Sequence, residues 1–83
     1  MKIGEKLLKQ ISKKYPPSDS VELRFGRYDV VLKTDEDGNA DLLFIGEKTE
    51  NGQIRGDRFH RRLLKDAEGK IVKDHWDYKG KVS

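Results

Sequence analysis

The sequence predicts an α+β fold, in which an N-terminal amphipathic helix packs on a four-stranded antiparallel β-meander to form one domain over residues 1–83. Apolar residues recur at helical spacing near the N-terminus, ahead of two consecutive prolines. Glycine-containing turn signals then recur along the rest of the chain, with strand-like segments between them. These observations predict one short helix followed by consecutive hairpins.

The helix is expected over residues 2–14 or so. Its apolar stripe consists of Ile3, Leu7, Leu8 and Ile11. Lysines lie mostly off this stripe, and Pro16 and Pro17 end the helix because a proline disfavours helical backbone before it. A helix of this length is marginal alone, so we expect it to cover one face of the sheet.

Strands are expected over about 21–34, 40–48, 53–65 and 70–78. They are separated by Asp37-Gly38-Asn39, Asn51-Gly52 and Glu68-Gly69, whose residue types tolerate the positive φ of tight hairpin turns. If each turn is a two-residue loop, the loops fix the register. The predicted cross-strand pairs are then Val31–Phe44, Leu32–Leu43, Phe44–Phe59, Asp41–Arg62, Phe59–Tyr78, His60–Asp77, Arg61–Trp76 and Arg62–His75.

The first predicted strand changes its alternation at Gly26-Arg27. Apolar residues occupy odd positions before this point and even positions after it. A β-bulge there would keep all of them on one face and bend the strand.

Both faces of the predicted sheet are substantially apolar, and one short helix can cover only one of them. In the predicted register the first face carries Val31, Leu42, Phe44, Phe59, Leu63, Trp76 and Tyr78, with Arg61 able to stack on Trp76. The second face supplies an expected interaction surface of Tyr28, Val30, Leu32, Leu43 and Ile45. We therefore expect a small binding or interaction module that acts through its second face, as a homodimer or with a protein partner.

A candidate binding site lies on the same predicted face. It comprises Arg58, His60, Arg62, His75 and Asp77. A carboxylate can orient an imidazole for general base catalysis, and arginines can hold an anionic substrate. A small enzyme that uses His60 and Asp77 is therefore an alternative, but a cross-strand polar ladder is the favoured interpretation. The chain is not expected to be an enzyme.

The charges are segregated along the chain. Its 18 basic and 15 acidic residues give a net charge of +3. Residues 1–14 are lysine-rich, residues 15–53 are acidic, and residues 54–65 contain an arginine cluster. Nucleic-acid or polyanion binding through the lysine-rich helix, Arg55, Arg58, Arg61 and Arg62 is a second alternative, ranked below mutual neutralisation within the fold because the net charge is small.

Other residue types narrow the classes further. The chain has no cysteine and two histidines, so neither a thiolate metal site nor a disulfide is expected. The acidic turn at residues 35–41 lacks the ligand spacing of an EF-hand, since Lys33 occupies the first ligand position. We expect no metal and no cofactor. The absence of a membrane-spanning apolar run and of a signal-peptide pattern favours a cytoplasmic protein.

Overall fold

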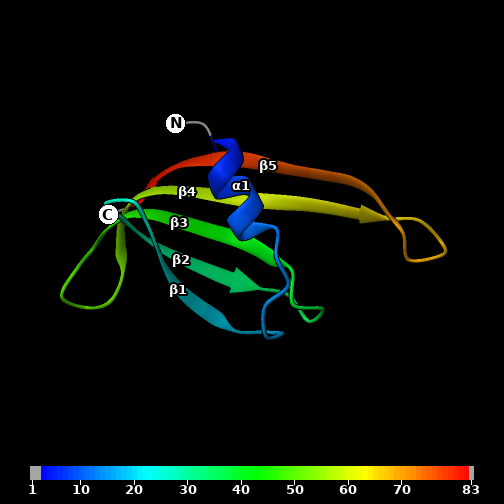
Figure 1. Cartoon of the computed structure of the whole chain (residues 1–83), viewed down its shortest axis with the longest axis horizontal. Helices are drawn as coiled ribbons and strands as arrows, with labels where there is room; N and C mark the ends of the chain where they lie inside the picture. The colour runs from blue at the N-terminus through cyan, green and yellow to red at the C-terminus, as the bar shows by residue number, and fades with distance from the viewer. Residues whose placement is uncertain (1–2, 83) are drawn as a thin grey trace.

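The computed structural model describes residues 3–82 as one short helix and a five-stranded antiparallel sheet. The strands follow chain order across the sheet, so every neighbouring pair is a hairpin (Figure 1). The elements are α1 (Glu5–Ile11), β1 (Ser20–Phe25), β2 (Tyr28–Thr34), β3 (Ala40–Lys48), β4 (Ile54–Lys65) and β5 (Ile71–Val82). The helix and meander predicted from sequence are confirmed, with one strand more than expected.

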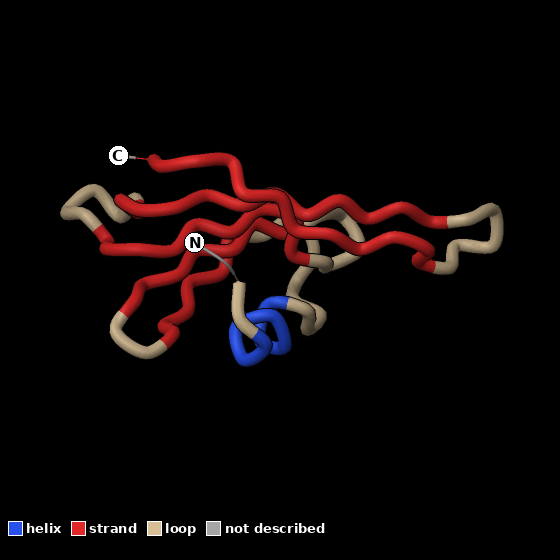
Figure 2. Tube along the Cα trace, turned by 90° about the horizontal axis from the view of Figure 1, so that it is seen from above, coloured by secondary structure: helices blue, strands red, loops and turns tan. Residues whose placement is uncertain are grey.

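Helix α1 is shorter than predicted, because the chain after it is recruited to the sheet. Ser12 caps the helix, and Lys14 already forms an isolated β-bridge with Asn39. The helix lies against one face of the sheet only (Figure 2). Two residues of the helix are buried, Leu7 and Ile11. The predicted helical residue Lys2 lies outside the described residues.

The segment predicted as one bulged strand is a hairpin of two strands. Phe25 pairs with Tyr28, so Gly26 and Arg27 are the loop. Gly26 has φ 61°, and a positive φ at the first loop residue is typical of a type II′ turn. A hairpin explains the change of alternation as well as a bulge does, because residues directly opposite each other project to the same face. The predicted bulge is therefore wrong, but the apolar residues on both sides of the turn do share a face.

The β2–β3 hairpin has its predicted register despite a longer loop. The N–H of Asp35 donates to the carbonyl of Asn39 at 2.9 Å, so the loop contains three residues instead of two. Asp41 is then an extra residue in β3, and this bulge restores the pairing of Leu32 with Leu43.

The β4–β5 hairpin repeats this arrangement. The N–H of Asp66 donates to the carbonyl of Lys70 at 2.9 Å, and Val72 is the extra residue that restores the register. The predicted pairs confirmed in this hairpin are Phe59–Tyr78, His60–Asp77, Arg61–Trp76 and Arg62–His75.

The β3–β4 hairpin has a different register from the one predicted. The N–H of Thr49 donates to the carbonyl of Gln53 at 2.7 Å across a three-residue loop, and the register that follows is continuous. Leu43 therefore lies opposite Phe59, one residue away from the predicted alignment. A shift of one residue exchanges the two faces of β4 and β5 relative to β3. The predicted pairs Phe44–Phe59 and Asp41–Arg62 are wrong.

The core lies between α1 and the covered face of the sheet. Its members are Leu7, Ile11, Val30, Leu32, Ala40, Leu43, Ile45 and Phe59. Phe59 joins this core because of the β3–β4 register. Partly buried residues around the edge of the core include Tyr15, whose hydroxyl donates to the carbonyl of Gln10 at 2.6 Å.

Strands β4 and β5 extend beyond the other strands as a two-stranded ribbon (Figure 1). The exposed apolar residues on this ribbon are Leu64, Ile71 and Val72. Nearer the other end of β5, two residues oppose Arg58, so the strand contains a second bulge at Gly80, whose φ is 96°.

Candidate functional site

The sheet face opposite α1, here called the open face, carries most of the candidate site. The register and the alternation of side chains place even-numbered β4 residues and odd-numbered residues 73–79 of β5 on this face. Its basic side chains are Arg24, Lys33, Lys48, Arg58, Arg62, Lys73 and Lys79. Its acidic side chains are Glu22, Asp29 and Asp77. Basic groups therefore outnumber acidic groups on the open face.

The binding residues predicted from sequence all lie on the open face. Arg58, His60 and Arg62 come from β4, and His75 and Asp77 come from β5. Side-chain contacts join only part of this set. Arg62 Nε lies 2.6 Å from Asp77 Oδ2, and His75 Nε2 lies 3.0 Å from Asp77 Oδ1. His60 faces Asp77 across the strands but has no hydrogen bond or ion pair with it among residues 3–82.

The contacts of Asp77 favour a structural carboxylate over a general base. The hydrogen bond from Arg62 is the main reason that the pKa of Asp77 lies below its usual value, and the positive charges nearby act in the same direction. A lower pKa makes the carboxylate a weaker base, and its oxygens are already occupied by Arg62 and His75. Arg62 and His75 therefore form a cross-strand polar ladder with Asp77.

Acidic groups on the open face are all paired, whereas several cations are not. Glu22 pairs with Lys48, and Asp29 lies 3.9 Å from Arg24. Within residues 3–82, no carboxylate lies within ion-pair distance of four basic side chains on this face, Lys33, Arg58, Lys73 and Lys79. Sequence reasoning identified Arg58 in this group but missed the lysines, because only the register assigns them to the face.

Most of the residues predicted to form an interaction surface are buried in the hydrophobic core. Val30, Leu32, Leu43 and Ile45 are each at most 1% exposed, and they lie on the face that α1 covers. The expectation that they line an uncovered face is therefore wrong. Tyr28 alone remains accessible, with the Arg27 guanidinium 5.3 Å from the centre of its ring.

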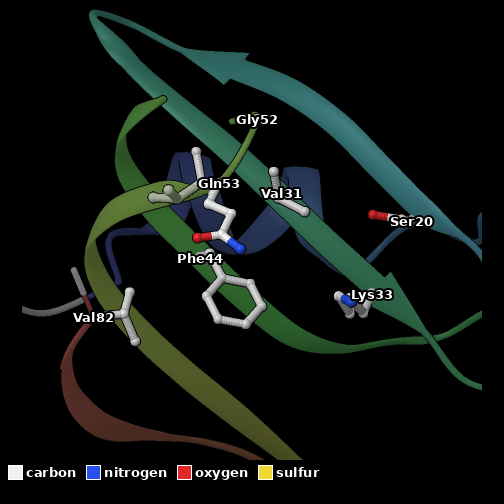
Figure 3. A pocket seen from close by; sticks show the side chains of 8 residues that line it. Ser20, Val31, Lys33, Phe44, Gly52, Gln53 and Val82 are labelled. Atoms are coloured by element: carbon white, nitrogen blue, oxygen red, sulfur yellow. The ribbon is translucent and has the colours of Figure 1, made fainter. Parts of the chain in front are cut away.

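A cavity of about 330 Å³ opens on the open face. Figure 3 shows the Gln53 amide beside the Phe44 ring, with Val82 on the opposite side from Ser20 and Lys33. The lining residues are Ser20, Val31, Lys33, Phe44, Gly52, Gln53, Ile54 and Val82. Sequence analysis did not anticipate this cavity, which combines residues from both halves of the meander.

The tip of the β3–β4 hairpin supplies Gly52, Gln53 and Ile54 to the cavity, together with residues of β1 and β2. Gly46 and Gly56 pair directly at the base of this tip. A Cβ on Gly46 would lie 2.2 Å from the carbonyl oxygen of Arg55, and a Cβ on Gly56 would lie 2.2 Å from that of Ile45. This close backbone approach is possible only for glycine.

The covered face contains an ion pair between buried Arg61 and exposed Asp74, which was not predicted from the sequence. Arg61 is 6% exposed, and its Nε and Nη2 atoms donate to the two carboxylate oxygens of Asp74 at 2.7 Å each. Its Nη1 donates to the carbonyl of Ala40 at 3.3 Å. The guanidinium also lies 5.6 Å from the Trp76 ring, as predicted from sequence. Arg61 is therefore unavailable to a polyanion on the open face.

The described part of the chain contains no group of three or more histidine, cysteine or acidic side chains arranged to hold a metal ion. No helix within residues 3–82 is both long and apolar enough to cross a membrane. The chain matches no protein-family model, no curated protein and no solved structure.

Proposed function

We propose that this protein is a small binding module that contacts the phosphate backbone of a nucleic acid through the open face of its sheet. The observation that carries the proposal is the group of cations on this face with no acidic partner among the described residues, centred on Arg58, Lys73 and Lys79 of β4 and β5. Neutralising nucleic-acid phosphates releases counterions, which is the main source of affinity for a basic surface of this kind.

The spacing of these cations suits an extended anion. Lys73 and Lys79 are six residues apart on β5, which corresponds to about 20 Å along a strand at ~3.3 Å per residue. Arg58 and Arg62 form a second row of cations beside them, on the neighbouring strand β4. Phosphates along one strand of a duplex rise ~3.4 Å per nucleotide, so the row spans about six phosphates.

The aromatic residues argue for contacts without base recognition. Phe59 is core, and Tyr78 packs against it with 5.2 Å between ring centres. Trp76 lies beneath Arg61 on the same covered face. These rings are not on the open face. The aromatic ring on that face is Phe44, which is half-buried opposite Arg58, so base stacking is limited to this one ring. We infer binding that depends on charge and salt but little on sequence.

Fluorescence anisotropy with a labelled 20-base-pair DNA tests the proposal. With three to four phosphate contacts, the dissociation constant should rise about 40-fold to 150-fold between 50 and 200 mM salt. The double variant Arg58→Glu/Lys79→Glu should weaken binding at least tenfold. The matched control Lys6→Glu/Lys9→Glu makes the same change in net charge on α1, behind the sheet, and should weaken it less than threefold.

Equal losses in the two double variants would overturn the proposed surface, because net charge alone would then explain binding. Absence of binding at 50 mM salt would overturn the function itself. Competition by polyglutamate as strong as that by unlabelled DNA would point to an acidic protein partner instead.

Self-association stays a prediction, with a weaker basis than the sequence suggested. The apolar residues assigned to the dimer surface are core. The apolar side chains left with exposed area on the open face are half-buried Val31, Leu42, Phe44 and Val82 and exposed Leu64. Sedimentation velocity at several concentrations tests this prediction. A single 9.6 kDa species at millimolar concentration would contradict it.

A further inference from the structure

We propose that the open-face cavity binds a small amphipathic carboxylate, with its apolar tail against the cavity floor and its carboxylate at Lys33 and Gln53. This site adjoins the proposed nucleic-acid surface, because Phe44 lies opposite Arg58, but its lining contains none of Arg58, Lys73 and Lys79. The cavity volume of about 330 Å³ is at the lower end of the range for small-molecule sites, which favours a small ligand.

The cavity floor is apolar and assembled from four strands. Its apolar members are Val31 of β2, Phe44 of β3, Ile54 of β4 and Val82 of β5. Ile54 is 7% exposed although it starts its strand. Half-buried Val31, Phe44 and Val82 present apolar surface that a ligand tail would remove from water.

The polar groups of the cavity fit an anion at the rim. Lys33 is exposed, and no carboxylate in the described chain lies within ion-pair distance of its ammonium group. Its stem lines the cavity while its charge remains in water, as lysine side chains commonly do. Gln53 supplies an amide N–H donor, and Ser20 supplies a hydroxyl. No acidic side chain lines this cavity, and the nearby Glu22, opposite Val31, is paired with Lys48.

Titration with sodium octanoate, followed by ¹H–¹⁵N NMR, tests the proposal on the full chain. We expect saturable shifts at Val31, Phe44, Gln53 and Ile54, with a dissociation constant on the order of 1 mM. Octan-1-ol should bind about fivefold more weakly, because it keeps the tail but lacks the charge. Octylamine should bind more weakly still, because its charge repels Lys33.

Two kinds of variant separate the tail and charge contributions. Lys33→Gln should weaken octanoate about fivefold and leave octan-1-ol unchanged, whereas Lys73→Gln removes an equal charge elsewhere and should change neither. Val31→Trp should fill the cavity and abolish binding of both ligands. Val82→Trp, near the end of β5, provides the same test if Val31→Trp does not fold.

Equal affinity for octanoate in wild type and Lys33→Gln would overturn the carboxylate assignment. Octanoate shifts centred on α1, or binding that survives both tryptophan variants, would overturn the cavity assignment. The outcome is distinguishable from that of the nucleic-acid proposal, because Lys73→Glu/Lys79→Glu should lose DNA binding and retain octanoate binding, since neither lysine lines the cavity.

Discussion

Gly46 and Gly56 face each other across the β3–β4 ladder, and each approaches the opposite strand so closely that a Cβ would lie 2.2 Å from a carbonyl oxygen. The pair stands at the base of the hairpin tip that supplies Gly52, Gln53 and Ile54 to the cavity. The shape of the open face therefore depends on two positions that contribute no side chain.

Gly46→Ala and Gly56→Ala should each destabilise the protein by about 2–3 kcal/mol, because a methyl group there forces the two strands apart. Urea unfolding measures the loss. Gly4→Ala is the control, since a Cβ at Gly4 would meet nothing within 4 Å and its cost should be about 1 kcal/mol or less. Equal losses at Gly4 and Gly46 would contradict the close approach.

Asp74→Asn should cost about 2 kcal/mol, because it leaves the buried Arg61 guanidinium without its counter-charge. The half-exposed position of Asp74 keeps this loss below that of a fully buried pair. Lys65→Gln breaks the exposed Lys65–Asp37 pair and should cost less than about 1 kcal/mol. Urea midpoints compare the two variants, and similar losses would contradict the importance of burial.

Stability should fall as the pH drops from about 5 toward 3. Hydrogen bonds from Arg61 hold the pKa of Asp74 below its usual value, and the Tyr78 hydroxyl has the same effect on the pKa of Asp57. A carboxyl group whose pKa is lowered by folding increases the free energy of unfolding. This contribution is complete above the unfolded pKa of about 3.9 and is lost as the pH falls through the lower pKa of the folded state. Urea unfolding at several pH values should show a smaller decline for Asp74→Asn than for wild type.

Asp35→Ala and Asp66→Ala should have different effects despite similar contacts. Asp35 Oδ1 accepts two loop N–H groups at 2.9 Å, and Asp66 Oδ1 does the same in the β4–β5 loop. Asp35→Ala should lower global stability by about 1–2 kcal/mol, because its loop contacts Tyr15 after the helix. Asp66→Ala should only increase amide exchange at the ribbon tip. Global destabilisation by Asp66→Ala would show that the ribbon folds with the rest of the sheet.

The pKa of Asp35 has opposing causes. Burial would raise it, but hydrogen bonds from the backbone N–H groups of Asn39 and Asp37 outweigh burial and lower it. Asp35→Ala should therefore also reduce the acid sensitivity of the protein, which the same pH series measures.

The predicted strands agreed well with the structure, but their register depended on details that residue types do not specify. Turn residues located three of the four hairpins, but the hairpin at Gly26-Arg27 was predicted as a bulge. Each of the three expected two-residue loops contains three residues. Compensating bulges at Asp41 and Val72 restored two of the predicted registers. No bulge follows the loop after Thr49, so that register is wrong. A bulge inserts one extra residue into a strand. The alternation of apolar and polar residues indicates this insertion only when the two faces of the strand differ clearly in polarity.

The candidate site was predicted in the same uneven way. Arg58, His60, Arg62, His75 and Asp77 share one face as expected, because the β4–β5 register was correct. The prediction placed them on the same face as Leu43 and Ile45, and this was wrong because the predicted β3–β4 register was shifted by one residue. The cavity could not be predicted, because it combines residues from β1, β2, β3, β4 and β5.

The bulge at Gly80 lies on the outer strand β5 and helps to prevent edge-to-edge aggregation of the sheet. Strand β5 is a twelve-residue outer strand, and such an edge presents unpaired backbone groups on which another chain could add a strand. Lys73, Lys79 and Lys81 place charges along it, and the bulge interrupts its regular hydrogen-bonding pattern. The longest edge of the sheet is therefore protected against aggregation, which leaves its faces as the surfaces for binding.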